Sequence, residues 1–289
     1  MMTFGNVLTA MVTPFDDQNE LDLERTEILV EHLLKNGTDG LVVGGTTGES
    51  PTLTNAEKLT LYKRVVEIAD GRIPVIAGTG SNNTFASIEF TKQVERLGVD
   101  GVLTVAPYYN KPNQEGIYQH FKAIAESTTL PIMLYNIPGR SVINVEPETT
   151  IALSKIPNIV AVKESSQDLF MMTKIIDQTD DDFMLYSGDD GFTLPVLSVG
   201  GKGIVSVSSH LLGNEMQEMV KAYFQGDVGK AAAMHRYLLP KMEAFFKAPS
   251  PSPVKTALNK AGILVGSVRL PLVPLSAEEE KQLYQDVGL

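Results

Sequence analysis

The feature that most constrains the fold is a series of eight short apolar runs, rich in β-branched residues and bounded by glycine, proline or asparagine. Most of them are continuously apolar and do not alternate, which is typical of parallel strands buried on both faces. The runs are Val7–Val12, Gly40–Gly44, Ile73–Gly78, Gly101–Ala106, Pro131–Asn136, Ile159–Lys163, Phe183–Ser187 and Gly203–Val207. They predict eight strands of a mainly parallel sheet.

Segments with helical periodicity separate these runs. One apolar stripe falls at Ala86, Phe90 and Val94, and Thr54 is followed three residues later by Glu57, the spacing of a capping box. Alternating strands and helices predict an α/β protein, and eight repeats favour a closed (β/α)₈ TIM barrel. An open doubly wound sheet is the alternative, because periodicity does not prove closure.

The strand pattern ends near residue 225, so we predict a catalytic barrel over 1–225 and a C-terminal helical appendix over 226–289. Within this tail, Pro240 is expected to kink or split a helix. Ser252 is expected to cap the next helix, and a last helix is expected over Ala277–Asp286.

Composition excludes several classes of protein. A net charge of −11 over 289 residues opposes binding to nucleic acid or to an anionic membrane surface. The chain has no cysteine, which excludes disulfides and thiol catalysis and favours the cytoplasm. No signal peptide is read at the N-terminus, and no apolar stretch is long enough for a transmembrane helix. The four histidines show no metal-binding spacing, so no metal is predicted.

Lys163 ends the sixth apolar run, in the sequence IVAVKESS. In a closed barrel, catalytic groups lie at the C-terminal ends of strands. An ammonium group buried there without a partner tends to lose its proton, and the neutral amine is a nucleophile for carbonyl carbons. The alternative is a structural ion pair with Glu164 or Asp189, and position alone does not separate the two.

Other strand ends carry further polar groups. Tyr135 ends the fifth run and could move protons near a Schiff base, although a core tyrosine is the alternative. Arg140 follows it in a loop suited to capture of a carboxylate. The segment GGTTGES, Gly44–Ser50, could form a carboxylate nest, with hydroxyls from Thr46 and Thr47.

Taken together, these segments resemble the dihydrodipicolinate synthase family of the pyruvate-dependent class I aldolase and lyase superfamily. The motifs occur in family order and span nearly the whole barrel and the start of the tail: GGTTGES, AGTGSNNT, PYYNKPNQEG, YNIPGR, VAVKESS, SGDD, GGKGIVSV and PSPSPVK.

The resemblance implies a reaction and a set of roles. Pyruvate would form a Schiff base with Lys163, tautomerise to the enamine and attack aspartate semialdehyde, a step toward diaminopimelate and lysine. The proton relay of the family would match Thr47, Tyr109 and Tyr135, with Tyr109 donated across a dimer interface. Thr46 and Thr47 would hold the carboxylate of pyruvate. Val205 would supply a backbone contact to pyruvate, and Arg140 would bind the semialdehyde.

The same resemblance implies no cofactor and a homotetramer built as a dimer of dimers. The alternative within the superfamily is an N-acetylneuraminate lyase or a keto-deoxy-sugar aldolase, which usually lacks the arginine found here at Arg140. A non-catalytic ligand-binding barrel is disfavoured, since Lys163, Tyr135 and Thr47 are all present.

Some members of the family bind lysine in a crevice at the dimer interface, and Ser50, Asn82 and Tyr108 match that crevice. Three other positions depart from the lysine-sensitive pattern of two histidines and a glutamate; they hold Asn55, Lys58 and Ala86. Without the carboxylate, and with an added cation, we predict weak or no inhibition by lysine.

Overall fold

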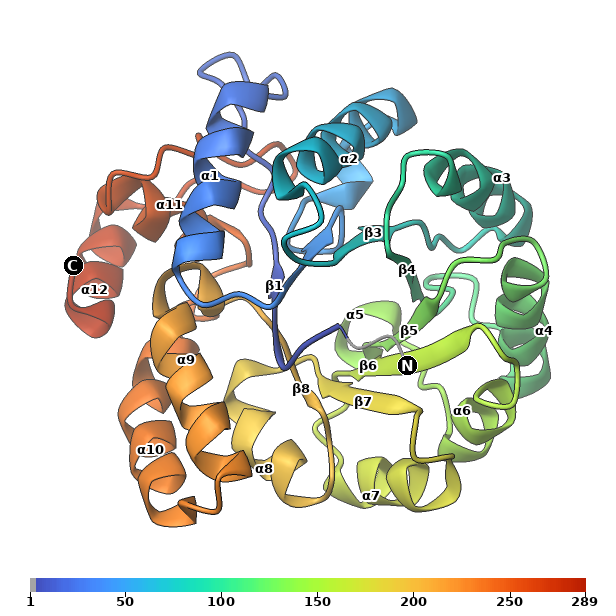
Figure 1. The fold of residues 1–289 in the computed structure, drawn as a ribbon. Coiled ribbons are helices and arrows are strands. Elements are labelled where there is room, and N and C mark those ends of the chain that lie inside the picture. The colour runs from blue at the N-terminus through green and yellow to red at the C-terminus, as the bar shows by residue number, and fades with distance from the viewer. Residues whose placement is uncertain (1–3) are drawn as a thin grey trace.

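The computed structural model describes residues 4–289 and contains a closed barrel of eight parallel strands in chain order, with β8 pairing back onto β1 (Figure 1). The strands are β1 (Val7–Ala10), β2 (Gly40–Val43), β3 (Val75–Gly78), β4 (Gly101–Val105), β5 (Ile132–Asn136), β6 (Ile159–Glu164), β7 (Met184–Ser187) and β8 (Gly203–Ser206). Each falls within, or within one residue of, a run predicted from the sequence. The closed barrel is confirmed, and the open sheet is wrong.

Helices surround the barrel and fill its connections (Figure 1). They are α1 (Leu23–Lys35), α2 (Asn55–Ala69), α3 (Thr84–Glu95), α4 (Gln114–Ala125), α5 (Pro138–Ser141), α6 (Pro147–Leu153), α7 (Leu169–Gln178), α8 (Thr193–Ser198), α9 (Ser209–Phe224), α10 (Val228–Ala244), α11 (Ser252–Lys260) and α12 (Ala277–Val287), with 3₁₀ turns η1 (Ser50–Thr52) and η2 (Asp190–Phe192). The predicted capping box at Thr54 and Glu57 is present at the start of α2.

Two apolar cores lie on opposite sides of the strands. A small cluster fills the barrel interior and includes Leu8, Ile76 and Met133. A larger cluster lies between the strands and the surrounding helices, and it includes Leu134 and Ile175. Successive strand residues alternate between these layers, so the register of each strand decides which side chains point inward.

The tail forms α10, α11 and α12 (Figure 1). The last helix α12 packs against α10 and α11, and both α10 and α11 contact α9. Two details of the prediction are wrong. The helix is not split at Pro240, because α10 runs through this residue. Ser252 does not cap α11, because it lies inside the first turn and its hydroxyl donates to the carbonyl oxygen of Val273. The division of the chain at residue 225 stays a prediction.

Within residues 4–289, no helix is long and apolar enough to cross a membrane.

Candidate active site

Lys163 lies near the C-terminal end of β6, directly opposite Tyr135 on β5 and Tyr186 on β7. Its side chain is buried, with 6% of the residue exposed. The amine nitrogen Nζ lies 4.3 Å from the centroid of the Tyr135 ring. Because Tyr135 belongs to the cluster inside the barrel, the lysine amine also faces the barrel axis. Strand register alone therefore brings these two predicted residues together.

Neither predicted ion-pair partner of Lys163 reaches it. Glu164 accepts hydrogen bonds from Asn136 Nδ2 at 3.0 Å and from the Ser166 N–H at 2.8 Å, and burial raises the pKa of its carboxyl to about 7. Asp189 accepts hydrogen bonds from the side-chain amide of Gln167 and from the Gly191 N–H. Among residues 4–289 no carboxylate forms an ion pair with the Lys163 amine, which leaves the nucleophile as the favoured interpretation.

A cavity of about 240 Å³ opens at this end of the barrel. It is lined by residues of β3, β4 and β5 and of the segments that follow β2, β3, β4 and β5, namely Gly44, Gly45, Thr46, Ser50, Pro51, Gly78, Gly80, Leu103, Val105, Tyr108, Tyr135, Ile137, Arg140 and Ser141. The predicted substrate residues Thr46 and Arg140 thus share one cavity with Tyr135. Arg140 reaches the cavity from the short helix α5, directly after β5, and its side chain is exposed.

The loop Gly44–Ser50 follows β2 and turns sharply back toward the barrel. Gly44 has a positive φ of 66°, and an added Cβ would overlap the ring of Tyr62. Within the loop, the Glu49 N–H donates to the Thr46 carbonyl oxygen at 3.1 Å and the Ser50 N–H to the Gly45 carbonyl oxygen at 3.3 Å. From outside the loop, Thr13 Oγ1 donates to the Gly48 carbonyl oxygen at 2.6 Å. These constraints fix the backbone that presents the two threonines.

The two threonines of this loop are not equivalent. Thr46 is half-buried and lines the cavity, whereas Thr47 is buried and is absent from the lining. The geometry therefore favours Thr46 as the threonine whose hydroxyl meets a ligand. The relay role assigned to Thr47 stays a prediction.

Besides Thr47, Lys163 itself and three other predicted residues are absent from the cavity lining. Tyr109 is 85% exposed and has a positive φ of 74°, an uncommon conformation for a side chain of this size. Val205 is buried in the barrel interior on β8. The backbone carbonyl oxygen of Asn82 accepts a hydrogen bond from Asn110 Nδ2. Tyr108, which is predicted to share a crevice with Asn82, lines the cavity instead.

Gly188 is a residue to which the sequence prediction gave no role. A Cβ at this position would lie 3.0 Å from Lys163 Cε and would overlap Ser165 Oγ. The absence of a side chain therefore leaves room for the stem of Lys163. The motif SGDD contains this glycine, but only the register of β6 and β7 shows what it contacts.

Within residues 4–289 no group of three or more His, Asp or Glu side chains is arranged to hold a metal ion.

A closed α/β barrel with a buried, uncompensated lysine amine beside a tyrosine has the site of a Schiff-base lyase. The chain belongs to the dihydrodipicolinate synthetase family, whose model matches residues 3–288.

Individual relatives agree with this assignment over nearly their full lengths. The chain is 61% identical to 4-hydroxy-tetrahydrodipicolinate synthase 1 of Halalkalibacterium halodurans over 282 aligned residues. The alignment covers 98% of this chain and 96% of the relative. A crystal structure of dihydrodipicolinate synthase from Bacillus anthracis is 58% identical, with a TM-score of 0.98 and coverage of 100% and 99%. A Cyanidioschyzon merolae enzyme solved with lysine bound is 48% identical, with a TM-score of 0.96 and coverage of 98% and 97%. The predicted family, barrel fold and lyase-type activity are confirmed.

Proposed function

We propose that this chain condenses pyruvate with aspartate semialdehyde through a Schiff base on Lys163, giving 4-hydroxy-tetrahydrodipicolinate on the route to diaminopimelate and lysine. The observation that carries the proposal is the Lys163 amine, buried against the Tyr135 ring without a carboxylate partner. The names of the relatives at about 60% identity support the choice of substrates.

The amine attacks the ketone carbon of pyruvate, and loss of water gives a lysine imine. The protonated imine withdraws electrons, so a C3 proton of pyruvate can leave and an enamine forms. The enamine carbon then attacks the aldehyde carbon of the semialdehyde, whose oxygen takes a proton. Cyclisation by the amino group of the semialdehyde displaces the Lys163 amine and releases the product.

Each predicted side chain has a part in this sequence. Thr46, Thr47 and the loop backbone bind the carboxylate of pyruvate, and Thr47 also belongs to the proton relay. The Tyr135 hydroxyl transfers protons during formation of the imine, including the proton that lets the ketone oxygen leave as water. Arg140, exposed at the rim of the cavity, binds the carboxylate of the semialdehyde. The backbone at Val205 contacts pyruvate.

The exposed Tyr109 completes the relay from a second subunit. A tyrosine that is 85% exposed in one chain, held at a positive φ, is suited to insertion into a neighbouring subunit. We therefore propose a homotetramer, built as a dimer of dimers, in the cytoplasm. Ser50, Asn82 and Tyr108 form part of the crevice between the two subunits of a dimer.

Borohydride reduction in the presence of pyruvate, followed by peptide mass mapping, tests the mechanism. The expected result is a reduced pyruvate adduct on Lys163 and on no other lysine. Absence of that adduct from the native enzyme refutes the mechanism. A coupled assay with aspartate semialdehyde, run beside cleavage of N-acetylneuraminate, distinguishes the synthase from the sugar lyase, because only the synthase consumes the semialdehyde.

A further inference from the structure

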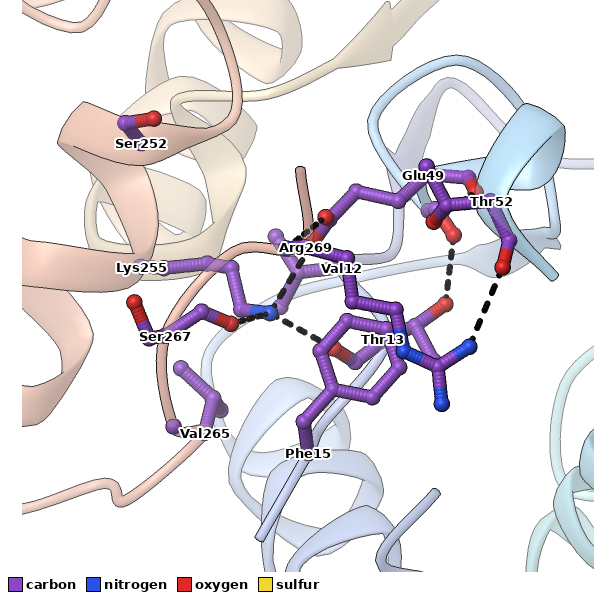
Figure 2. A network of polar contacts seen from close by, with 12 residues as sticks. Val12, Thr13, Phe15, Glu49, Thr52, Ser252, Lys255, Val265, Ser267 and Arg269 are labelled. Carbon is purple, nitrogen blue, oxygen red and sulfur yellow. Dashed lines mark hydrogen bonds and ion pairs between the residues drawn. The ribbon is translucent and has the colours of Figure 1, made fainter. Parts of the chain in front are cut away.

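Lys255 is a buried lysine that the proposed reaction does not use. It lies in α11, in the tail, and its side chain is 1% exposed. Its amine donates to three oxygens, the Thr13 carbonyl at 2.9 Å, the Glu49 carboxylate at 2.9 Å and the Ser267 carbonyl (Figure 2). The three donors of the ammonium group are thus all used. Its nitrogen also lies 4.2 Å from the centroid of the Phe15 ring.

Glu49, the partner of this ammonium, belongs to the loop Gly44–Ser50 at the active site. Its side chain is fully buried, and both carboxylate oxygens bind the tail. Oε1 accepts from Lys255, and Oε2 accepts from the backbone N–H of Arg269 at 2.9 Å (Figure 2). Its φ is 54°, a left-handed conformation that costs free energy for a glutamate. The contacts with the tail therefore hold a strained residue in place.

Two short paths connect Lys255 to the backbone of the loop, one ending at Thr46 and the other at Gly48. The backbone N–H of Glu49 donates to the Thr46 carbonyl oxygen. Thr13, whose carbonyl oxygen binds the Lys255 amine, donates its own hydroxyl to the carbonyl oxygen of Gly48 at 2.6 Å. The ammonium thus holds the loop directly through Glu49 and indirectly through Thr13.

A buried ion pair adds little to the free energy of unfolding, because the cost of desolvating the two charges offsets much of their attraction. The pair instead specifies one arrangement of the groups around it. Elsewhere in the tail, Lys247 and Asp286 form an exposed ion pair at 2.7 Å, away from the loop. The buried pair is the one that meets the carboxylate-binding loop.

We propose that Lys255 and Glu49 are positioning residues through which the tail fixes the loop Gly44–Ser50 for the carboxylate of pyruvate. This inference rests on the proposed function, since it assigns the loop to pyruvate. Neither residue touches the substrate. Their removal weakens pyruvate binding, because Thr46 and its neighbouring N–H groups are then no longer held in one geometry.

The test is a double-mutant cycle with Lys255→Met, Glu49→Gln and the double variant, read as the KM for pyruvate and the KM for aspartate semialdehyde. Borohydride titration counts the active sites that form the adduct, and rates are expressed per active site. Unfolded protein therefore does not affect the kinetic constants. Lys247→Met is the matched control, because it removes a lysine charge from an exposed pair in the same tail.

Each single exchange should raise the KM for pyruvate about tenfold or more, with the KM for the semialdehyde changed less than about twofold. The double variant should be no worse than the poorer single variant, because the two side chains act as a unit. Lys247→Met should leave both constants unchanged.

Three results would overturn the inference: an unchanged KM for pyruvate in Lys255→Met, an equal rise in both KM values, or single effects that multiply in the double variant. If Lys255→Met does not fold, Glu49→Gln and the double variant carry the test, since the double variant leaves neither charge buried alone. Failure of the native enzyme to form the adduct would refute the proposed function instead.

Discussion

The Lys163 amine lies 4.3 Å from the centre of the Tyr135 ring, and the two residues are directly paired across β5 and β6. The ring therefore packs against the amine, while the hydroxyl of the same residue is the proposed proton carrier. These two contributions are separable, because phenylalanine keeps the ring and removes the hydroxyl.

Tyr135→Phe should retain a Lys163 adduct at equilibrium but should lower kcat by about 10²–10⁴-fold, the usual contribution of a positioned acid or base. Steady-state rates and the rate of borohydride trapping measure the two effects. Lys163→Met is the reference, and it should form no adduct. A Tyr135→Phe enzyme with native kcat would remove the tyrosine from the relay.

Gly188→Ala should misplace Lys163, because the added methyl group would lie 3.0 Å from Lys163 Cε and would overlap Ser165 Oγ. We expect kcat/KM to fall by about tenfold to a hundredfold, since small displacements of a reacting group are costly. The rate of adduct formation should fall in parallel. Gly229→Ala, in α10, is the control, because its Cβ has ample room. Equal activities of the two variants would contradict the packing argument.

Arg140→Ala should damage use of the semialdehyde while adduct formation with pyruvate survives. Arg140 is exposed at the rim of the cavity, away from the buried amine. Loss of a charged hydrogen-bonding partner should reduce kcat/KM for the semialdehyde by about tenfold to a hundredfold. Arg140→Lys should recover part of the loss, because it restores the charge without the planar fork. Equal loss of both activities would exclude the proposed role.

Lysine should inhibit this enzyme weakly or not at all. Ala86 offers no carboxylate for the ammonium group of the ligand, and Lys58 adds a like charge, although burial lowers the pKa of its amine. Ala86→Glu should strengthen inhibition, because position 86 is exposed in the first turn of α3 and can accept a longer side chain. Ala86→Gln is the neutral control. Half-inhibition of the native enzyme at sub-millimolar lysine would show this prediction to be wrong.

The barrel was predictable from sequence because each strand is a local, continuously apolar run, and eight such runs favour closure. Lys163 and Tyr135 were predictable for a related reason, since strand ends in a parallel barrel converge at one mouth. Local patterns do not reveal which of two adjacent threonines faces a cavity. Thr46 and Thr47 differ only in the path of the loop backbone.

The same reasoning could not predict contacts between residues that are distant in the sequence. Lys255 and Glu49 are 206 residues apart, and no periodicity links them. The capping role expected of Ser252 failed for a similar reason, because a distant carbonyl group, that of Val273, takes its hydroxyl. Both cases concern the tail, whose position depends on packing against the barrel and not on its own sequence pattern.

The buried ring of His210 is held in its neutral form. Its Nδ1 lies 2.7 Å from the Val207 carbonyl oxygen, to which it donates, and its Nε2 accepts from the Val12 N–H at 3.1 Å. A proton on Nε2 would face that N–H, so protonation breaks the contact. Burial lowers the pKa of His210 to about 4.

His210 should therefore make the protein less stable in acid. The unfolded ring takes up a proton near pH 6.5 and the folded ring only near pH 4, so the free energy of unfolding falls as pH drops between these values, by up to about 3 kcal/mol. Urea unfolding between pH 4.5 and 7 measures this slope. His210→Gln, which can still donate and accept, should reduce this slope but not abolish it, because burial also lowers the pKa of His120 to about 4. His235→Gln, on the half-buried face of α10, should retain most of the slope. Parallel slopes for the native protein and His210→Gln would exclude His210 as the source.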